Sequence, residues 1–220
     1  MTAHTVKRFQ RPRLPTRQSI VRVLSLGYGQ RRLAVLALLL LSGCVGVVTS
    51  TPPGSTNETR PVYLLDHGRH ATLVLTREDQ TLVRYAFGEW RWYAKDQVGP
   101  IRAVSTLLLP TESTLGRRLL QPAEDEINLR QQIPVFVQAL YTLESPATEI
   151  DALDQRLSAL FEERAAHSVF NAQWGLTFVP GPRPYTLLHN SNHVIAEWLE
   201  ALGINVRGNP MFGHWRLERY

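Results

Sequence analysis

Two short apolar runs separated by a glycine indicate paired strands in the middle of the chain. Residues 61–75 (PVYLLDHGRHATLVL) are rich in Val, Leu and Tyr on both sides of Gly68, which predicts two strands joined by a turn or bulge. The next apolar run, 81–87, follows the polar stretch 77–80, which has the length of a hairpin connection. We therefore expect an antiparallel sheet contributed mainly by residues 61 to about 110.

Helical spacing of apolar residues is typical of the second half of the chain. Residues 123–143 predict a helix that Pro134 breaks or kinks near its middle. The clearest helix is predicted to begin at residues 148–151, which resemble a capping box. Its apolar stripe consists of Ile150, Leu153, Leu157, Leu160 and Phe161.

A third helix is predicted after the polar triplet 190–192 (NSN), whose three side chains are all common at helix N-caps. Gly203 is a natural stop for this helix. Its apolar stripe consists of Val194, Ile195, Trp198, Leu199 and Leu202. Strands followed by helices predict an α+β fold, in which helices pack on an antiparallel sheet.

The single cysteine of the chain, Cys44, ends a stretch that resembles a bacterial lipobox. An unbroken apolar run, 33–41, follows two arginines and leads into Leu-Ser-Gly-Cys at 41–44. A basic segment, a short apolar run and small residues before a cleavage point are typical of a secretory signal. Nine apolar residues are too few for a membrane-spanning helix, which needs roughly 20. Residues 1–43 are therefore predicted to be a lipoprotein signal peptide, with lipidation at Cys44.

Lipidation would hold the protein on a membrane of the cell envelope, because combined acyl chains anchor a protein stably. The long segment before the apolar run fits either a translation start further downstream or an extended leader. Val45 stands where an aspartate retains some lipoproteins in the inner membrane, which favours the outer membrane. Residues 44–60 are rich in Ser, Thr, Pro and Gly and predict a flexible tether. A single domain, 61–220, is expected to follow.

The predicted leader also accounts for the positive charge of the chain. The full sequence carries 24 Lys and Arg against 19 Asp and Glu, a net charge of +5. Eight of the basic residues and none of the acidic residues precede Cys44, so the remainder has 16 basic and 19 acidic residues, net −3. We therefore expect no nucleic-acid partner. With one cysteine, the domain forms no internal disulfide and must rely on packing.

Three segments of the predicted domain resemble the NlpC/P60-like, papain-type superfamily in circularly permuted order. They are 66–75 (DHGRHATLVL), 87–93 (FGEWRWY) and 189–199 (HNSNHVIAEWL), and the middle segment is similar to a branch of unknown function labelled DUF2459. In that branch a histidine follows a His-Gly turn and opens a strand, and a later cysteine-asparagine pair opens a helix. The resemblance covers most of residues 61–206 and implies a permuted papain-like fold.

Carried over position by position, the resemblance implies a general base at His70, a nucleophile at Ser191 and an orienting acid at Glu89. Ser191 stands where the family has its cysteine. This departure matters because a serine hydroxyl stays protonated and must lose its proton to a base during attack. The resemblance also implies neighbouring residues that would contact substrate, namely Asn192, His67 and Trp90.

Each candidate also has a purely structural interpretation. Ser191 lies where a serine commonly caps a helix, a role worth about 1 kcal/mol. His70, on a strand, is often a hydrogen-bonded structural histidine. A helix N-terminus nevertheless supplies free N–H donors that can stabilise an oxyanion beside a nucleophile, so the catalytic interpretation stays open.

A metal site has little support in the sequence. His189 and His193 are four residues apart, as two ligands on one helical face would be, but the glutamate of an HExxH motif is absent. His67 and His70 are three residues apart in an extended segment, so their rings are predicted to point to opposite faces. We therefore expect neither a metal nor a cofactor.

Two hypotheses for the function follow. In the first, an envelope lipoprotein hydrolyses or transfers an amide or acyl group through Ser191 and His70. In the second, a non-catalytic lipoprotein holds peptidoglycan, peptide or lipid fragments in the same cleft. The two hypotheses differ in whether the His70 imidazole reaches the Ser191 hydroxyl.

Overall fold

The structure is a computed structural model that describes residues 45–49, 58–97, 99 and 109–218. The predicted signal peptide, 1–43, and the predicted lipidation site, Cys44, lie outside these residues. All of the described residues belong to one compact unit, Gly43–Tyr220. None of the helices in the described ranges has the length and apolar character needed to cross a membrane.

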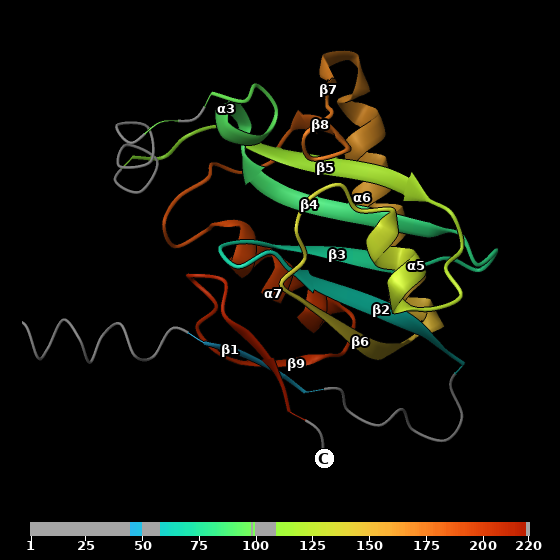
Figure 1. Ribbon diagram of the computed structural model, residues 1–220. Coiled ribbons are helices and arrows are strands. Elements are labelled where there is room, and N and C mark those ends of the chain that lie inside the picture. The colour runs from blue at the N-terminus through green and yellow to red at the C-terminus, as the bar shows by residue number, and fades with distance from the viewer. Residues whose placement is uncertain (1–44, 50–57, 98, 100–108, 219–220) are drawn as a thin grey trace, which may run out of the picture. The chain divides into compact units, whose positions relative to one another are not determined.

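A seven-stranded sheet forms the centre of this unit (Figure 1), and every neighbouring pair of strands in it is antiparallel. The strand order is β6-β2-β3-β4-β5-β8-β7. The prediction of an α+β fold with an antiparallel sheet is confirmed. The strands are β2 (Thr59–Asp66), β3 (Ala71–Thr76), β4 (Leu82–Glu89), β5 (Ser113–Leu120), β6 (Ala139–Pro146), β7 (Val169–Asn171) and β8 (Leu176–Pro180).

The sheet extends well beyond the residues predicted to form it. The β2–β3–β4 meander agrees with the sequence pattern, but β6, β7 and β8 come from the second half of the chain. The predicted helix over 123–143 is wrong, because only α5 (Glu126–Gln131) is helical there. Pro134 follows that helix, and from Ala139 onward the chain pairs with the full length of β2. Pairing with a distant strand has overridden the local helical pattern.

Two helices cover the back of the sheet in Figure 1, α6 (Ala147–Glu163) and α7 (Ser191–Ala201). Side chains alternate between the two faces along a strand, and Val83, Tyr85 and Phe87 of β4 face these helices in the largest hydrophobic cluster. The intervening side chains face the front of the sheet. There Leu82 packs in a cluster with Leu129 of α5.

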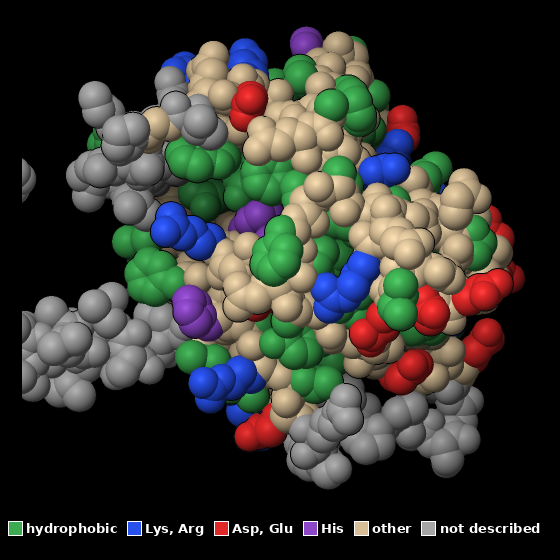
Figure 2. Space-filling view, in the orientation of Figure 1, with side chains coloured by type: hydrophobic (Ala, Val, Ile, Leu, Met, Phe, Trp, Pro, Cys, Tyr) green, Lys and Arg blue, Asp and Glu red, His purple; other side chains and the backbone are tan. Residues whose placement is uncertain are grey.

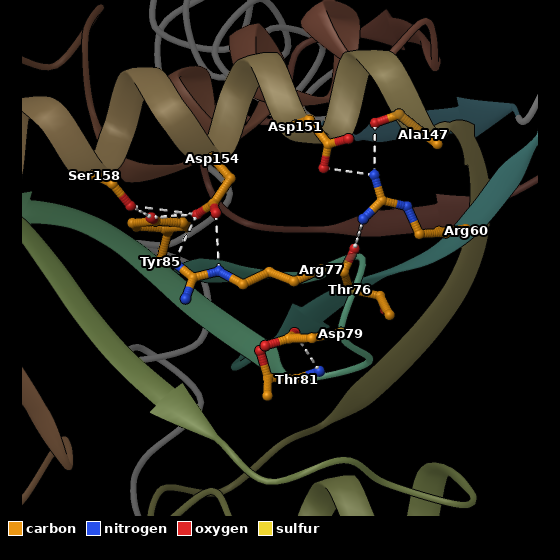
Figure 3. A network of polar contacts seen from close by, with 10 residues as sticks. All are labelled: Arg60, Thr76, Arg77, Asp79, Thr81, Tyr85, Ala147, Asp151, Asp154 and Ser158. Atoms are coloured by element: carbon orange, nitrogen blue, oxygen red, sulfur yellow. Dashed lines mark hydrogen bonds and ion pairs between the residues drawn. The ribbon is translucent and has the colours of Figure 1, made fainter.

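Polar contacts fasten α6 to the strands beneath it (Figure 3). The Asp154 carboxylate accepts hydrogen bonds from the Tyr85 hydroxyl at 2.6 Å and from the Arg77 guanidinium at 2.9 Å. Burial and the Asp154 carboxylate raise the pKa of the Tyr85 phenol. One turn earlier, the Arg60 guanidinium donates to Asp151 at 2.5 Å. These contacts fix the position of α6 over β2, β3 and β4.

A second sheet of three strands joins two distant parts of the chain. Strand β1 (Gly46–Thr49) lies between β9 (Asn205–Gly208), to which it is antiparallel, and β10 (Trp215–Leu217), to which it is parallel. The Val48 side chain is fully buried in the largest hydrophobic cluster. The prediction of a flexible tether over 44–60 is therefore wrong for residues 46–49, which form β1. The composition of this segment gives no sign that it pairs with strands near the end of the chain. Residues 59–60 also belong to β2 rather than to a tether.

Candidate functional site

The turn between β2 and β3 brings two histidines together. Asp66 accepts a hydrogen bond from the Gly68 N–H at 2.7 Å, and the His67 N–H donates to the His70 carbonyl at 2.9 Å. Gly68 has φ +94°, a conformation that favours glycine. The His67 and His70 rings are stacked, with centroids 4.7 Å apart. The prediction that they point to opposite faces is wrong, because the segment between them is a tight turn and not a continuous strand.

His67 is held in one neutral form by its neighbours. Its Nδ1 lies 2.8 Å from the Phe136 carbonyl, which can only accept, so Nδ1 carries the proton. Its Nε2 therefore accepts, from the Thr72 hydroxyl at 3.0 Å and from the Arg84 guanidinium at 3.4 Å. Burial, together with the charge of Arg84, lowers the pKa of His67 to about 4. This imidazole is neutral at pH 7.

His70 lies in an aromatic enclosure. Its ring centroid is 5.6 Å from that of Tyr93 and 5.0 Å from that of Trp174, both in edge-on geometry. Its Nε2 is buried and has no hydrogen-bond partner among the described residues. Burial lowers the His70 pKa well below its usual value, and His67 and Arg84 lower it further.

The start of helix α7 forms the opposite side of the site. Asn190 is the N-cap, and its side-chain oxygen accepts from the N–H groups of Asn192 and His193. Ser191 is the first helical residue, so the structural interpretation of Ser191 as the cap is wrong. The Asn192 side chain donates to the Arg69 carbonyl at 3.0 Å, which ties the helix to the histidine turn. Its Oδ1 is buried without a partner in the described part of the chain.

Tyr185 lines the cleft together with Ser191. Burial raises the pKa of the Tyr185 phenol, and contacts with the N–H and hydroxyl of Ser191 offset this only in part. Glu89, at the end of β4, is 3 % exposed, and its carboxylate accepts from the Trp92 N–H at 2.6 Å. It is thus the N-cap of the short helix α3 (Trp90–Tyr93). Burial raises the pKa of the Tyr93 phenol, and the Glu89 carboxylate raises it further, as it does the pKa of Tyr185.

These elements enclose one cleft of about 870 Å³. Five of the six residues predicted for the site line it: Ser191, His70, Glu89, Asn192 and His67. Trp90 does not, since it is buried in a hydrophobic cluster with Leu176 and Phe178. The neighbouring Trp92 lines the cleft in its place. Five of the six predicted residues thus lie around one cleft, and its lining includes Trp92 rather than Trp90.

Several lining residues were missed by sequence reasoning. Tyr185 and Trp174 supply aromatic walls, and the loop that contains Met211, Phe212 and His214 also contributes to this lining. The cluster of aromatics at 90–93 was a signal for a cleft wall, and Trp92 and Tyr93 do line the cleft. The loop after β9 has no comparable signal, because only its pairing with β1 brings it to the site.

The predicted catalytic residues lie around one cleft, but hydrogen bonds do not connect them to one another. The His70 Nε2 makes no hydrogen bond to Ser191 or to any other described residue. The Glu89 carboxylate is engaged with a backbone N–H of α3. A histidine whose pKa is strongly lowered is also a weaker general base. The described residues therefore contain no hydrogen-bonded path from Glu89 through the His70 Nε2 to Ser191.

No metal-binding cluster of three or more His, Cys, Asp or Glu side chains occurs in the described ranges. The His189 Nδ1 lies 2.9 Å from the Pro184 carbonyl, and the His193 Nδ1 lies 3.0 Å from the Asn190 side chain. The two rings thus bond to different residues, Pro184 and Asn190. The cleft residues likewise offer no set of carboxylates that would hold a cation.

Comparisons with known proteins add no assignment to this geometry. No family model, no curated protein and no solved structure matches the chain.

Proposed function

We propose that the chain is a cell-envelope lipoprotein, held on a membrane through Cys44, whose cleft binds a peptide or acyl fragment without cleaving it. A permuted papain-like fold is part of this proposal. It is supported by the order of a histidine turn, an acidic strand end and a polar helix start along one antiparallel sheet. The lipid anchor is supported by the lipobox-like sequence at 41–44.

The observation that carries the proposal is the cleft itself. Its volume of about 870 Å³ lies in the range of small-molecule sites. Aromatic walls provide apolar contact area, while Ser191, Asn190 and Arg69 provide polar groups along the same surface. The unbonded His70 Nε2 argues against a working Ser–His pair.

Binding can be measured by tryptophan fluorescence, because Trp92 and Trp174 line the cleft. The probes are a peptidoglycan disaccharide-tetrapeptide and an N-acylated dipeptide. We expect saturable binding of at least one probe, weakened about tenfold by Trp92→Ala, since about 1.4 kcal/mol of lost aromatic contact corresponds to tenfold in affinity. Ile127→Ala is the matched control, because Ile127 is exposed on α5 and outside the cleft. Equal binding by both variants, or no binding of either probe, would contradict the proposal.

A Ser191-dependent hydrolase or transferase is the second candidate. It is favoured by one observation, that Asn190 caps α7 and leaves the Ser191 hydroxyl free of the capping role. A fluorophosphonate probe separates the two candidates, because an activated serine hydroxyl attacks phosphorus and displaces fluoride. The binding proposal expects no adduct on Ser191. An adduct lost in Ser191→Ala but kept in Ser168→Ala, a variant of an exposed serine, would favour the enzyme.

A further inference from the structure

The position of β1 limits where the proposed lipid anchor can lie, because this strand begins two residues after Cys44. Gly46 pairs with Gly208 at the end of β9 and with Trp215 at the start of β10. The Gly46 N–H donates to the His214 carbonyl at 2.7 Å. The first residues after the predicted lipidation site are thus part of the folded unit.

Strand register then locates the anchor relative to the cleft. The 209–214 loop joins β9 to β10 and therefore lies at the Gly46 end of the small sheet. The same loop contributes Met211, Phe212 and His214 to the cleft lining. The start of β1 and one end of the cleft are on the same side of the molecule.

Chain connectivity limits how far the acyl chains can be from this end. Two residues span at most about 7 Å, so the Cys44 backbone lies within that distance of Gly46. Diacylated cysteine places its chains in the hydrocarbon layer directly next to its backbone. A domain anchored there has little freedom to turn the Gly46 end away from the bilayer.

The surface at this end has the composition that a lipid interface favours. Phe212 is 42 % exposed on the cleft rim, and Leu188, beside the lining residue Leu187, is 73 % exposed. Arg69, which lines the cleft, is exposed and forms no ion pair with any described residue. Figure 2 shows hydrophobic side chains interspersed with blue basic and purple histidine side chains along the left side of the molecule. Apolar side chains flanked by positive charge bind the headgroup region of anionic membranes.

We infer that the rim of the cleft, formed by Leu188, Met211 and Phe212, docks on the lipid bilayer that anchors Cys44, so that ligands enter the cleft from the membrane surface. This inference rests on the proposed lipid anchor. It goes beyond that proposal in assigning an orientation to the domain and a location to its ligands. A flexible tether of 17 residues would have allowed every orientation, but β1 leaves a link of two residues between the anchor and the fold.

The test places an environment-sensitive fluorophore on the full chain, produced in bacteria that process lipoproteins. Leu188→Cys and Phe212→Cys report on the rim, and Leu119→Cys is the control. Leu119 is 60 % exposed, and it pairs with Val83 whereas the cleft residue Glu89 pairs with Ser113. The control site therefore lies six residues, roughly 20 Å, along the strands from the cleft. An acylated Cys44 does not react with the label, so each variant carries one fluorophore.

Each labelled protein is reconstituted into vesicles of phosphatidylcholine and phosphatidylglycerol that carry a nitroxide near the carbonyl end of one acyl chain. We expect quenching at Leu188→Cys and Phe212→Cys to be at least about threefold stronger than at Leu119→Cys, because docked side chains reach about 5–10 Å into the interface. Protein that floats with the vesicles but shows equal or weak quenching at all three sites would overturn the orientation and leave the lipid anchor intact. Protein that fails to float would contradict the anchor itself, and the orientation would fall with it.

Discussion

Arg84 is a fully buried guanidinium whose hydrogen-bond acceptors among the described residues are all neutral. Its N–H groups reach the Thr72 hydroxyl and the Trp174 carbonyl at 3.1 Å each, and His67 Nε2 at 3.4 Å. Burial without a carboxylate lowers the Arg84 pKa to about 9, so the group still carries its charge at pH 7. That charge opposes protonation of His67 and His70. The Arg84 guanidinium therefore places a permanent positive charge beside the neutral imidazoles of His67 and His70.

The lowered pKa of His67 predicts a loss of stability in mild acid. Its pKa is about 4 in the folded protein against 6.5 in the unfolded chain. Between these values the unfolded chain binds a proton that the folded protein rejects, so the contribution is present above pH 6.5 and is lost as the pH falls toward 4. At pH 5 the free energy of unfolding should be lower than at pH 7 by about 2 kcal/mol from this residue.

Urea denaturation of wild type and His67→Gln at pH 7 and pH 5 measures this difference. The variant cannot titrate at this position, so its stability should depend less on pH by the same amount. His167→Gln serves as the control, because His167 is exposed at the end of the short 3-10 helix Ala165–His167 and should leave the pH dependence unchanged. An unaltered pH dependence in His67→Gln would refute the assignment of this residue as the acid-sensitive group.

The sequence predicts an N-cap for helix α7 among residues 190–192, but it does not show which of the three side chains is the cap. Asn190 accepts two N–H groups of the first turn, and its own amide donates to the carbonyls of Leu187 and Met211. Ser191, one residue later, has already entered the helix. The cap and the 209–214 loop are thus connected through a single side chain.

Replacing Asn190 should therefore be more costly than replacing its neighbour. We expect Asn190→Ala to lower the free energy of unfolding by at least about 1 kcal/mol more than Ser191→Ala, since an N-cap alone is worth about 1 kcal/mol. Chemical denaturation followed by circular dichroism gives both values. A larger loss in Ser191→Ala would mean that the serine, and not the asparagine, stabilises the start of α7.

Elements with local signals were predictable from the sequence, and elements defined by distant partners were not. The β3–β4 hairpin and α7 follow from apolar periodicity and turn residues within a few positions. The local pattern predicts helix at the start of β6, because the strand itself depends on pairing with β2. The site shows the same division. The motifs placed His70 and Ser191 in one cleft, but the stacking of His70 on His67 depends on the backbone of Gly68.

At the scale of the whole molecule, β1 makes the start of the folded unit part of its core. Val48 is fully buried, whereas the preceding Val47 is only partly covered. We expect Val48→Ala to lower the free energy of unfolding by about 2 kcal/mol through lost burial and a cavity, and Val47→Ala by much less. Thermal or urea unfolding of the two variants is the measurement. Equal, negligible effects would indicate that residues 46–49 behave as a tether after all.

The position of β1 also has a consequence for the order of folding. Both of its partner strands, β9 and β10, are made from residues 205–217, so β1 stays unpaired until those residues have been made. Closing a contact across so long a stretch of chain is slow compared with forming the local β2–β3–β4 meander. We therefore expect the meander to form before β1 pairs with β9 and β10. The 209–214 loop, which lines part of the cleft, is then expected to take its position only after the meander has formed.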